Sequence, residues 1–588
     1  MDRTIPIKNL PEVSLFTSDA HFEIAVSNVE TDDATSVIKL SMRADTSASP
    51  QPVTLRWRLP SVNVKGVWKC GGIHDKRLQY DWELEHLRTR ISVDAPVISV
   101  FGHDDTNVLT FACADAINLV DMNALLREED LHLYCHVTLF SERHPAITEY
   151  ETEIRVDTRR INYATSIGAV AEWWSKMPEL KPAPVPALAR VPLYSTWYNF
   201  HQDLDEQAIL EECRIAADIG YRLIILDDGW QTLDNNRGYD YTGDWEPDRF
   251  ADLAGFVKEI HKIGMQFGLW FSVPFCGPKS KAYQRFKGKF LTENHRWAPV
   301  FDPRYPEVRD YLIGTYVNAL RAYDLDAFKL DFIDDFRVYP ETELTKADGR
   351  DYANVNAAVD RLLSDVMSAL RAIKPEVGIE FRQRYVGPAM RKFGNMFRAF
   401  DCPNDPVSNR IRTVDVKLLM GNSAVHSDPQ IWHTDEPVEV AALQVLNPFF
   451  AVPQMSIHLR HASKDYLDMV RFYTQYWNDH VEILLDGQFT AQNPLANYPI
   501  LRATKNDHAI VGVYDDIAVT LGTEQTTDVL NAKIGGGVLV RSKESVACQM
   551  QIWNCQGQLQ TEEGIHLAGG VTEIPVPNSG LLRLTKSK

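Results

Sequence analysis

The chain has 588 residues, of which 45% are hydrophobic and 24% charged, a composition typical of soluble globular proteins. Its formal net charge is −19, from 80 acidic and 61 basic residues, which argues against nucleic acid or an anionic membrane surface as a partner. The length predicts about three or four domains. Residues 1–6 lack the apolar core of a signal peptide, and the eight cysteines are dispersed without close metal-type or redox-type pairs. A cytoplasmic, reduced protein is therefore expected.

Residues 1–160 read as short segments in which apolar and polar side chains alternate, separated by turn residues; examples are residues 22–26, 53–57 and 131–137. This period of two predicts an antiparallel β-sandwich. Residues 161–190 follow as a predicted helix over 163–177 and a stiff connector that contains Pro178, Pro182, Pro184 and Pro186.

The pattern changes over residues 191–490, where apolar strand-like runs alternate with helices of more than ten residues. The expected strands are residues 193–198, 223–226, 266–271, 328–333, 378–381, 397–400, 418–425 and 452–457. The expected helices are residues 205–219, 253–263, 306–323, 352–373 and 463–479. Eight buried strands, mostly followed by helices, predict a (β/α)8 TIM barrel. A doubly wound sheet is the competing fold, but no glycine-rich phosphate loop follows the first strand.

Alternation returns over residues 491–588, for example in 509–514 and 537–540, and predicts a small antiparallel β domain. The predicted fold class is therefore a multidomain α/β protein. A central TIM barrel lies between an N-terminal β-sandwich and a C-terminal antiparallel β domain.

The run of residues 327–333 places Lys329 and Asp331 two positions apart in an apolar strand, so both side chains point to the same face. An ammonium beside a desolvated carboxylate keeps that carboxylate ionised. A positioned anion of this kind is what a covalent glycosidase nucleophile requires. The alternative is a strand whose polar residues only mark its solvent-exposed end.

Active sites of such barrels lie at the carboxyl ends of the strands. Seven of the eight predicted strands deliver an aromatic or polar group there: Trp197 and Tyr198; Asp227 and Asp228; Trp270; Lys329 and Asp331; Glu380, Arg382 and Gln383; Arg398 and Asp401; His426 and Asp428. Aromatic faces and carboxylates together suit a sugar. Each group also has a purely structural interpretation. Asp227 and Asp228 could form a turn, the tryptophans could belong to the core, Arg398 and Asp401 could form an ion pair, and His426 and Asp428 could lie in a capped loop. The carboxylates Asp331, Asp334 and Asp335 could alternatively bind a divalent metal.

These strand ends carry a family resemblance. The segments 226–230, 329–331, 398–401 and 418–422, followed by 426–428 and 436–444, resemble the melibiase-type α-galactosidases, which are retaining glycoside hydrolases. The resemblance covers the barrel and implies that Asp331 is the nucleophile and Asp401 the acid/base. It further implies that the sugar contacts Trp197, Asp227, Asp228 and Lys329, and that no metal or cofactor is needed. Trp270, Arg382, Arg398 and His426 complete the predicted sugar-binding set. The predicted partner is an α-glycoside, and the resemblance implies a homo-oligomer.

The chain also departs from the family pattern. Residues 271–276 lack the acidic motif that many relatives carry after the third strand, and Arg382 and Arg384 follow the fifth strand where relatives have a Cys or a small glycine-rich turn. The two arginines leave open an anionic or otherwise modified sugar. Within the enzyme interpretation, the main alternative is an α-glycosidase or transglycosylase for another sugar, including an anionic or N-acetylated one. Asp405 stays open as a second acid/base candidate.

The expected mechanism is double displacement, with the two carboxyl groups roughly 5–5.5 Å apart. This mechanism requires different pKa values at the two carboxyl groups. We expect Lys329 to lower the pKa of Asp331, and burial near Phe400 to raise the pKa of Asp401. Two classes remain as alternatives: a metal-dependent barrel enzyme with Lys329 as its base, and a non-catalytic carbohydrate-binding or scaffolding protein.

Overall fold

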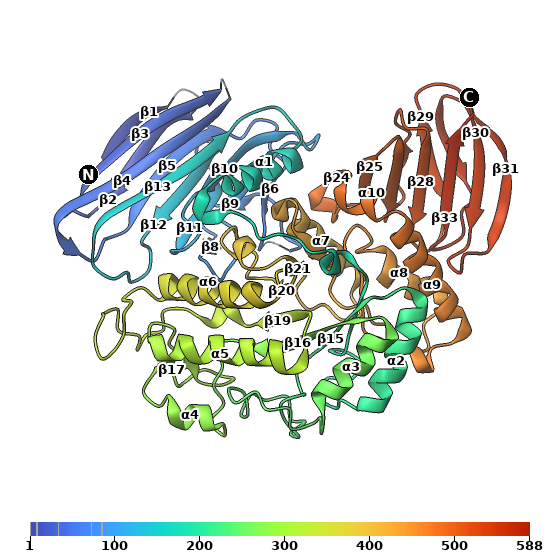
Figure 1. Cartoon of the computed structure of the whole chain (residues 1–588). Helices are drawn as coiled ribbons and strands as arrows, with labels where there is room; N and C mark the ends of the chain where they lie inside the picture. The colour runs from blue at the N-terminus through green and yellow to red at the C-terminus, as the bar shows by residue number, and fades with distance from the viewer. Residues whose placement is uncertain (1, 8–9, 33, 72, 84–85, 588) are drawn as a thin grey trace.

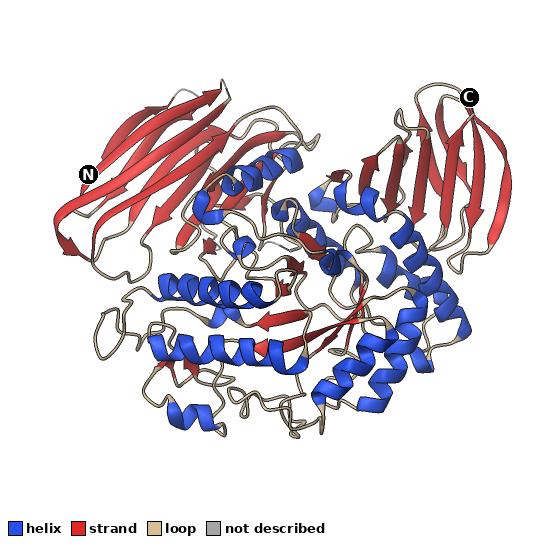
Figure 2. Cartoon of the chain, viewed as in Figure 1, coloured by secondary structure: helices blue, strands red, loops and turns tan. Residues whose placement is uncertain are grey.

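The computed structural model describes residues 2–7, 10–32, 34–71, 73–83 and 86–587. Three regions follow one another along the chain (Figure 1): a blue N-terminal sandwich, a green and yellow barrel, and orange-red C-terminal sheets. Figure 2 shows that helices surround the barrel, whereas the two end regions are almost entirely strands. The predicted fold class is confirmed.

The N-terminal region is a sandwich of two mostly antiparallel sheets. One sheet contains β1 (Asp2–Ile7), β2 (Leu10–Thr17), β5 (Val53–Pro60), β12 (His132–Leu139), β11 (Val120–Arg127), β7 (Gln79–Tyr80) and β8 (Leu87–Thr89). The other contains β3 (Glu23–Asp32), β4 (Thr35–Ala48), β13 (Ile147–Asp157), β10 (Asn107–Cys113), β9 (Val97–Phe101) and β6 (Gly66–Lys69). Every second residue of β12 is buried, as the alternation in its sequence requires. Helix α1 (Tyr163–Ser175) and the short turns η1 (Pro178–Leu180) and η2 (Ala187–Arg190) lead into the barrel.

Eight parallel strands form the barrel sheet, and bridges from His426 to Val452 and from Gln430 to Met455 nearly close it. In chain order the strands are β14 (Leu193–Ser195), β15 (Leu223–Leu226), β16 (Gln266–Ser272), β19 (Ala327–Asp331), β20 (Gly378–Arg382), β21 (Met396–Arg398), β22 (Ala424–His426) and β23 (Gln454–Met455). Neighbours in the chain are neighbours in the sheet, so the carboxyl ends of all eight strands meet at one mouth.

The helices of this region are α2 (Glu206–Ile219), α3 (Leu253–Ile263), α4 (Lys281–Arg285), α5 (Pro306–Tyr323), α6 (Val355–Ile373), α7 (Pro406–Met420), α8 (Val438–Leu446), α9 (Lys464–Asp479) and α10 (Val481–Asp486). A hairpin of β17 (Phe290–Thr292) and β18 (Val300–Phe301) and the turns η3 (Ile333–Asp335), η4 (Met390–Lys392) and η5 (Leu459–His461) complete it, whereas η6 (Pro494–Ala496) belongs to the C-terminal region. Helices α3 and α5 have the predicted bounds. No helix in the described part of the chain combines the length and the hydrophobicity needed to cross a bilayer.

The prediction of a seventh strand over 418–425 is wrong in its first half. Residues Leu418 to Met420 form the last turn of α7, which ends at Gly421, and only Ala424–His426 is extended. Leu418, Leu419 and Met420 are buried because the helix packs its apolar face on the barrel, and a run of three apolar residues does not distinguish a buried helix end from a strand.

The C-terminal region has two sheets. The larger contains β24 (Gln488–Gln492), β25 (Ile500–Lys505), β26 (His508–Val513), β28 (Thr526–Asn531), β33 (Leu581–Lys586), β30 (Val546–Trp553) and β31 (Leu559–Leu567). The smaller contains β27 (Val519–Thr520), β29 (Val538–Ser542) and β32 (Gly570–Ile574). Two pairs, β26 with β28 and β27 with β29, are parallel rather than antiparallel, because successive strands alternate between the two sheets instead of forming hairpins.

One buried carboxylate of the barrel contacts both flanking regions. Asp415 of α7 accepts hydrogen bonds from Trp68 Nε1 (2.9 Å) and Lys76 Nζ (2.9 Å) of the sandwich. It also accepts from the Tyr498 hydroxyl (2.6 Å), which comes from the C-terminal region. All four side chains are buried, so the three regions share a polar junction inside the molecule.

Candidate active site

The side chains at the barrel mouth converge on Asp331, the last residue of β19, whose side chain is 8% exposed. Oδ1 of Asp331 accepts three hydrogen bonds: from Arg382 Nε (2.8 Å), from the Tyr385 hydroxyl (2.7 Å) and from the backbone N–H of Phe332 (2.7 Å). Oδ2 accepts one, from Trp270 Nε1 (3.0 Å). Oδ1 is therefore saturated, whereas Oδ2 keeps a lone pair available.

These contacts keep the carboxyl ionised. Burial raises the pKa of Asp331 and is the largest single effect, while the charges of Arg382 and Lys329 lower it. Hydrogen bonds from Trp270 and Tyr385 add to the lowering, and the net pKa lies well below its ordinary value.

The cation in contact with Asp331 is not the one that the spacing predicted. Lys329 Nζ pairs with Asp227 Oδ2 at 2.6 Å, and both side chains are almost fully buried. Arg382 instead contacts Asp331, because the register that pairs Lys329 with Glu380 carries Arg382 alongside Asp331 on the neighbouring strand. The low pKa of Asp331 was predicted correctly, but its largest lowering contribution comes from the next strand.

Asp227 and Asp228 follow β15 and lie beside this centre. The side chain of Asp228 is held by Gln231 Nε2 (2.7 Å) and Gln202 Nε2 (2.8 Å), and burial raises its pKa to about 7. Gly229 has φ +117°, and a Cβ there would lie 2.6 Å from Gln202 Cα, so only glycine lets the two segments approach this closely.

Asp401, which follows β21, has a side chain that is 35% exposed and accepts a hydrogen bond from Arg398 Nη2 at 2.9 Å. Burial raises the pKa of Asp401, but the charges of Arg398, Arg382 and Lys329 outweigh it and the net pKa is lowered. The predicted upward shift is therefore wrong for the unliganded site, because the apolar neighbour Phe400 is outweighed by three cations.

Arg398 and His426 are fully buried. Arg398 also donates to Asp428 and lies near Glu380 (3.7 Å), so it organises three carboxylates. The ring nitrogens of His426 contact the Ala189 carbonyl (2.9 Å) and Gln454 Nε2 (3.2 Å). Both side chains are engaged by protein partners, and we revise their predicted sugar-binding role to a supporting one.

Asp405, the other acid/base candidate, caps helix α7. Its carboxylate accepts from the backbone N–H of Ser408 at 2.9 Å, a typical N-cap contact. This use of the side chain favours Asp401 as the carboxylate that faces the site.

The carboxylates of the metal alternative do not converge. Asp331 already accepts four hydrogen bonds, and Asp335 Oδ1 lies 3.2 Å from His295 Nε2. Across the described ranges, the one group with metal-type spacing is His480, His508 and Asp528. In that group, Arg583 donates two hydrogen bonds of 2.7 Å to Asp528, so its guanidinium already supplies the positive charge that a metal ion would bring.

Sequence reasoning missed several residues around the centre. Tyr385 lies three positions beyond β20, and Gln202 and Gln231 lie in loops, where strand periodicity gives no signal. An aromatic rim was also missed: Trp297 is 40% exposed and packs on Tyr239 with ring centroids 5.7 Å apart. Phe400, beside Asp401, is 37% exposed. Trp197, which was predicted, is half-buried and packs edge-on against His201.

An eight-stranded parallel barrel with an ionised, hydrogen-bonded carboxylate at its mouth is typical of barrel enzymes that act through carboxylate pairs. Residues 187–383 match the Melibiase protein family. The chain is 31% identical over 150 residues to "Alpha-galactosidase AgaA" of Geobacillus stearothermophilus, an alignment that covers 24% of this chain and 20% of that protein. It is 29% identical over 164 residues to "Probable alpha-galactosidase C" of Aspergillus flavus, covering 24% and 21%. The alignments thus span about a fifth of these curated relatives.

Solved structures match over the whole chain. The GH36 α-galactosidase AgaA of Geobacillus stearothermophilus aligns with a TM-score of 0.65 and 15% identity, covering all of this chain and 87% of that one. The α-galactosidase of Lactobacillus brevis aligns with a TM-score of 0.65 and 14% identity, covering 100% and 85%. The resemblance to melibiase-type α-galactosidases is confirmed: the chain resembles them in the sequence of residues 187–383, which form the first part of the barrel, and in its overall fold.

Proposed function

We propose that this protein is a retaining, exo-acting, α-galactosidase-like glycoside hydrolase that releases terminal α-linked galactose or a galacto-configured sugar. The observation that carries the proposal is the hydrogen bonding of Asp331: Oδ1 is saturated by three donors, so Oδ2 is the oxygen free to attack. The relatives named α-galactosidases, including AgaA solved in complex with raffinose, support the substrate class.

In the first step, Oδ2 of Asp331 forms a bond to the anomeric carbon as the glycosidic C–O bond breaks. Asp401 gives its proton to the departing oxygen. In the second step, water gives a proton to Asp401 and attacks the anomeric carbon, and the ester bond to Asp331 breaks. Asp401 is ionised in the unliganded site, so binding must provide the proton-donating form; a bound sugar that covers the exposed third of its side chain raises its pKa.

The groups proposed to hold the sugar are Asp227, Asp228 and Lys329, with the half-buried Trp197 as an aromatic wall. Trp270, predicted as a second wall, is fully buried, and its part in the site is the hydrogen bond that it donates to Asp331 Oδ2. The carboxylates accept from sugar hydroxyls, and the ring face of Trp197 covers the apolar patches of a pyranose. The rim residues Trp297 and Phe400 are exposed and suit contact with the leaving group.

An anionic sugar was considered because two arginines lie at the end of β20 and just beyond it, but both arginines are already paired with carboxylates of the protein. Arg382 is paired with Asp331 at 2.8 Å, and Arg384 is paired with Asp94 at 2.6 Å. A neutral sugar is favoured, because an added carboxylate would compete with existing ion pairs in a site already rich in carboxylates.

A panel of 4-nitrophenyl α-glycosides tests the proposal. We expect turnover of the α-galactoside well above that of the α-glucoside, α-galacturonide and N-acetyl-α-galactosaminide. Proton NMR of the first product should show α-galactose before mutarotation. Activity that disappears on thorough chelation, or β-galactose as the first product, would contradict it.

Replacing Tyr385 with phenylalanine removes one of the three donors to Oδ1 with little change in volume. A hydrogen bond to a charged group contributes about 1.5–3 kcal/mol, so we expect kcat/KM to fall about 10- to 100-fold. The pKa of Asp331 should rise, because Tyr385 lowers it, and activity should therefore be lost at a higher pH on acidification. An unchanged acidic limb in the pH–rate profile would argue against this contact.

A cytoplasmic location and a homo-oligomer remain predictions. All eight cysteines are free and buried, which supports a reducing compartment. Cell fractionation and light scattering of the purified protein would test the two.

A further inference from the structure

The N-terminal sandwich reaches the active-site segment that follows β20. The backbone N–H of Asp94 donates to the Arg384 carbonyl at 2.6 Å. In return, Arg384 donates through Nη2 (2.6 Å) and Nε (3.0 Å) to Oδ2 of Asp94. The Asp94 side chain is 2% exposed, so its charge depends on this arginine, whereas the Arg384 side chain is 56% exposed.

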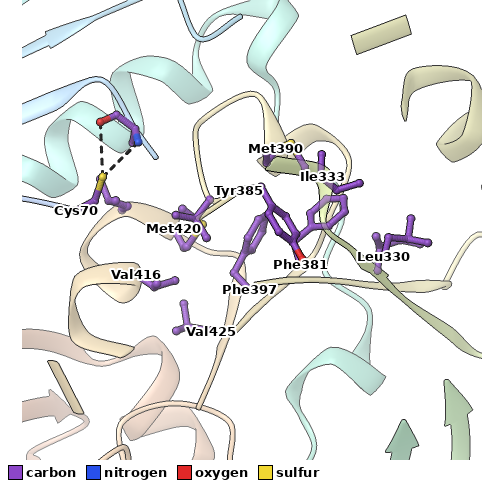
Figure 3. Close-up of a cluster of buried hydrophobic side chains, with 14 of the residues drawn as sticks. Cys70, Leu330, Ile333, Phe381, Tyr385, Met390, Phe397, Val416, Met420 and Val425 are labelled. Carbon is purple, nitrogen blue, oxygen red and sulfur yellow. Dashed lines mark hydrogen bonds between the residues drawn. The ribbon is translucent and has the colours of Figure 1, made fainter. Parts of the chain in front are cut away.

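Close backbone packing surrounds this ion pair. A Cβ at Gly387 would lie 2.5 Å from the Asp94 carbonyl oxygen, so the two segments lie in direct contact. The thiol of Cys70 contacts the backbone of Ala95 beside it, at 3.3 Å to the N–H and 3.7 Å to the carbonyl. Figure 3 shows these dashed contacts of Cys70 and, in the same buried cluster, Tyr385 with Phe381 and Met390 of the barrel.

The segment held in this way supplies half of the donors to Asp331. Arg382 and Tyr385 stand on either side of Arg384 in the chain, and both donate to Oδ1 of Asp331. A shift of Arg384 would therefore move both donors together, since each lies within two positions of it in the chain.

We propose that Asp94 is a positioning residue of the active site: by clamping Arg384, the N-terminal sandwich fixes residues 382–385 so that Arg382 and Tyr385 reach Asp331. This inference rests on the proposed function, because it assigns the sandwich a part in the reaction at Asp331. Asp94 does not touch the reacting atoms; it acts through Arg384 and the backbone.

Two substitutions test the clamp from its two sides. Asp94→Asn keeps the size of the side chain and removes the buried charge. Arg384→Gln removes the cation from the buried Asp94, which costs stability, so this variant is assayed well below its unfolding midpoint. Because small displacements of catalytic groups cost up to about 100-fold in rate, we expect each variant to lose roughly 10- to 100-fold in kcat, with KM changed less than about threefold. The double variant should be no worse than either single variant, because both remove the same contact.

Arg143→Gln is the matched control. Arg143 of the sandwich donates to the Tyr339 carbonyl (2.5 Å) and the Pro340 carbonyl (3.2 Å) of the barrel, away from residues 382–385. It should keep wild-type kcat. Thermal unfolding midpoints should stay within a few degrees for Asp94→Asn and Arg143→Gln, whereas Arg384→Gln should unfold at a lower temperature because Asp94 loses its cation.

Hydrogen exchange of residues 382–387 gives a readout that does not depend on substrate. We expect faster exchange in Asp94→Asn and in Arg384→Gln, but not in Arg143→Gln. Wild-type kcat and unchanged exchange in Asp94→Asn would overturn the clamp, as would additive losses in the double variant. If the wild-type protein turns over none of the α-glycosides, the proposed function fails, and the exchange data alone then decide whether Asp94 holds this segment.

Discussion

Asp331→Asn should lower kcat on 4-nitrophenyl α-galactoside by on the order of 10⁴-fold, comparable to the loss of a principal catalytic group in other enzymes. The amide is a poor nucleophile and carries no charge for Arg382 to stabilise. It also conflicts with the site: Oδ1 faces three donors and Oδ2 a fourth, so the new NH2 group must face an N–H or O–H whichever way it is oriented. Steady-state kinetics, together with thermal unfolding to show an intact fold, would measure this.

Asp405→Asn is the control for this experiment. It makes the same chemical change at a carboxylate that caps α7, and asparagine caps helices about as well as aspartate. It should retain near wild-type kcat. An Asp331→Asn variant with near wild-type turnover, or an Asp405→Asn variant that is inactive but folded, would transfer the chemistry away from Asp331.

Asp401→Asn should show a loss that depends on the leaving group. A positioned general acid accelerates the reaction by about 10²- to 10⁴-fold. The full acceleration is needed only when the departing oxygen is strongly basic, as is the sugar hydroxyl oxygen that leaves from an oligosaccharide such as raffinose. A 4-nitrophenolate leaves without a proton, so the first step with this substrate should be much less affected. Comparing kcat/KM for the two substrates in the variant and the wild type measures the difference.

The Asp401→Asn substitution should not disturb the position of Arg398. In the Asp401→Asn variant the amide oxygen can still accept the hydrogen bond that Arg398 Nη2 donates at 2.9 Å, so the arginine keeps its place and the loss reflects the proton rather than a rearrangement. Equal losses on both substrates would assign Asp401 a binding role instead of proton transfer.

The sequence predicts which residues stand at the barrel mouth but not which of them touch. Strand period and the parallel barrel place Asp227, Trp270, Lys329 and Asp331 at one end, because position along a strand is a local property. Pairing is not local: Lys329 and Asp331 share a face, but Lys329 pairs with Asp227, which follows β15 two strands away in the sheet, and Asp331 pairs with Arg382 of the adjacent β20. The register between strands depends on packing of the whole sheet, so the exchange of partners could not be predicted.

Groups beyond the strand ends were the hardest to predict. Tyr385 and Gln202 reach the centre from irregular segments, whose course depends on tertiary contacts such as that between Asp94 and Arg384. Helix α7 is different, since its start had a local signal. Asp405 at the N-cap and Pro406 at the first helical position form a typical helix beginning, which the prediction of a strand over residues 418–425 did not use.

The junction at Asp415 bears on how this protein can be divided. Deleting either flanking region would remove donors from a buried carboxylate of the barrel and leave its charge or its polar partners uncompensated in an apolar interior, at a cost of several kcal/mol. Truncation to a minimal barrel should therefore give insoluble or partly folded product, and heat should melt all three parts in a single transition. Engineering efforts are better directed at loops of the intact chain than at shortening it.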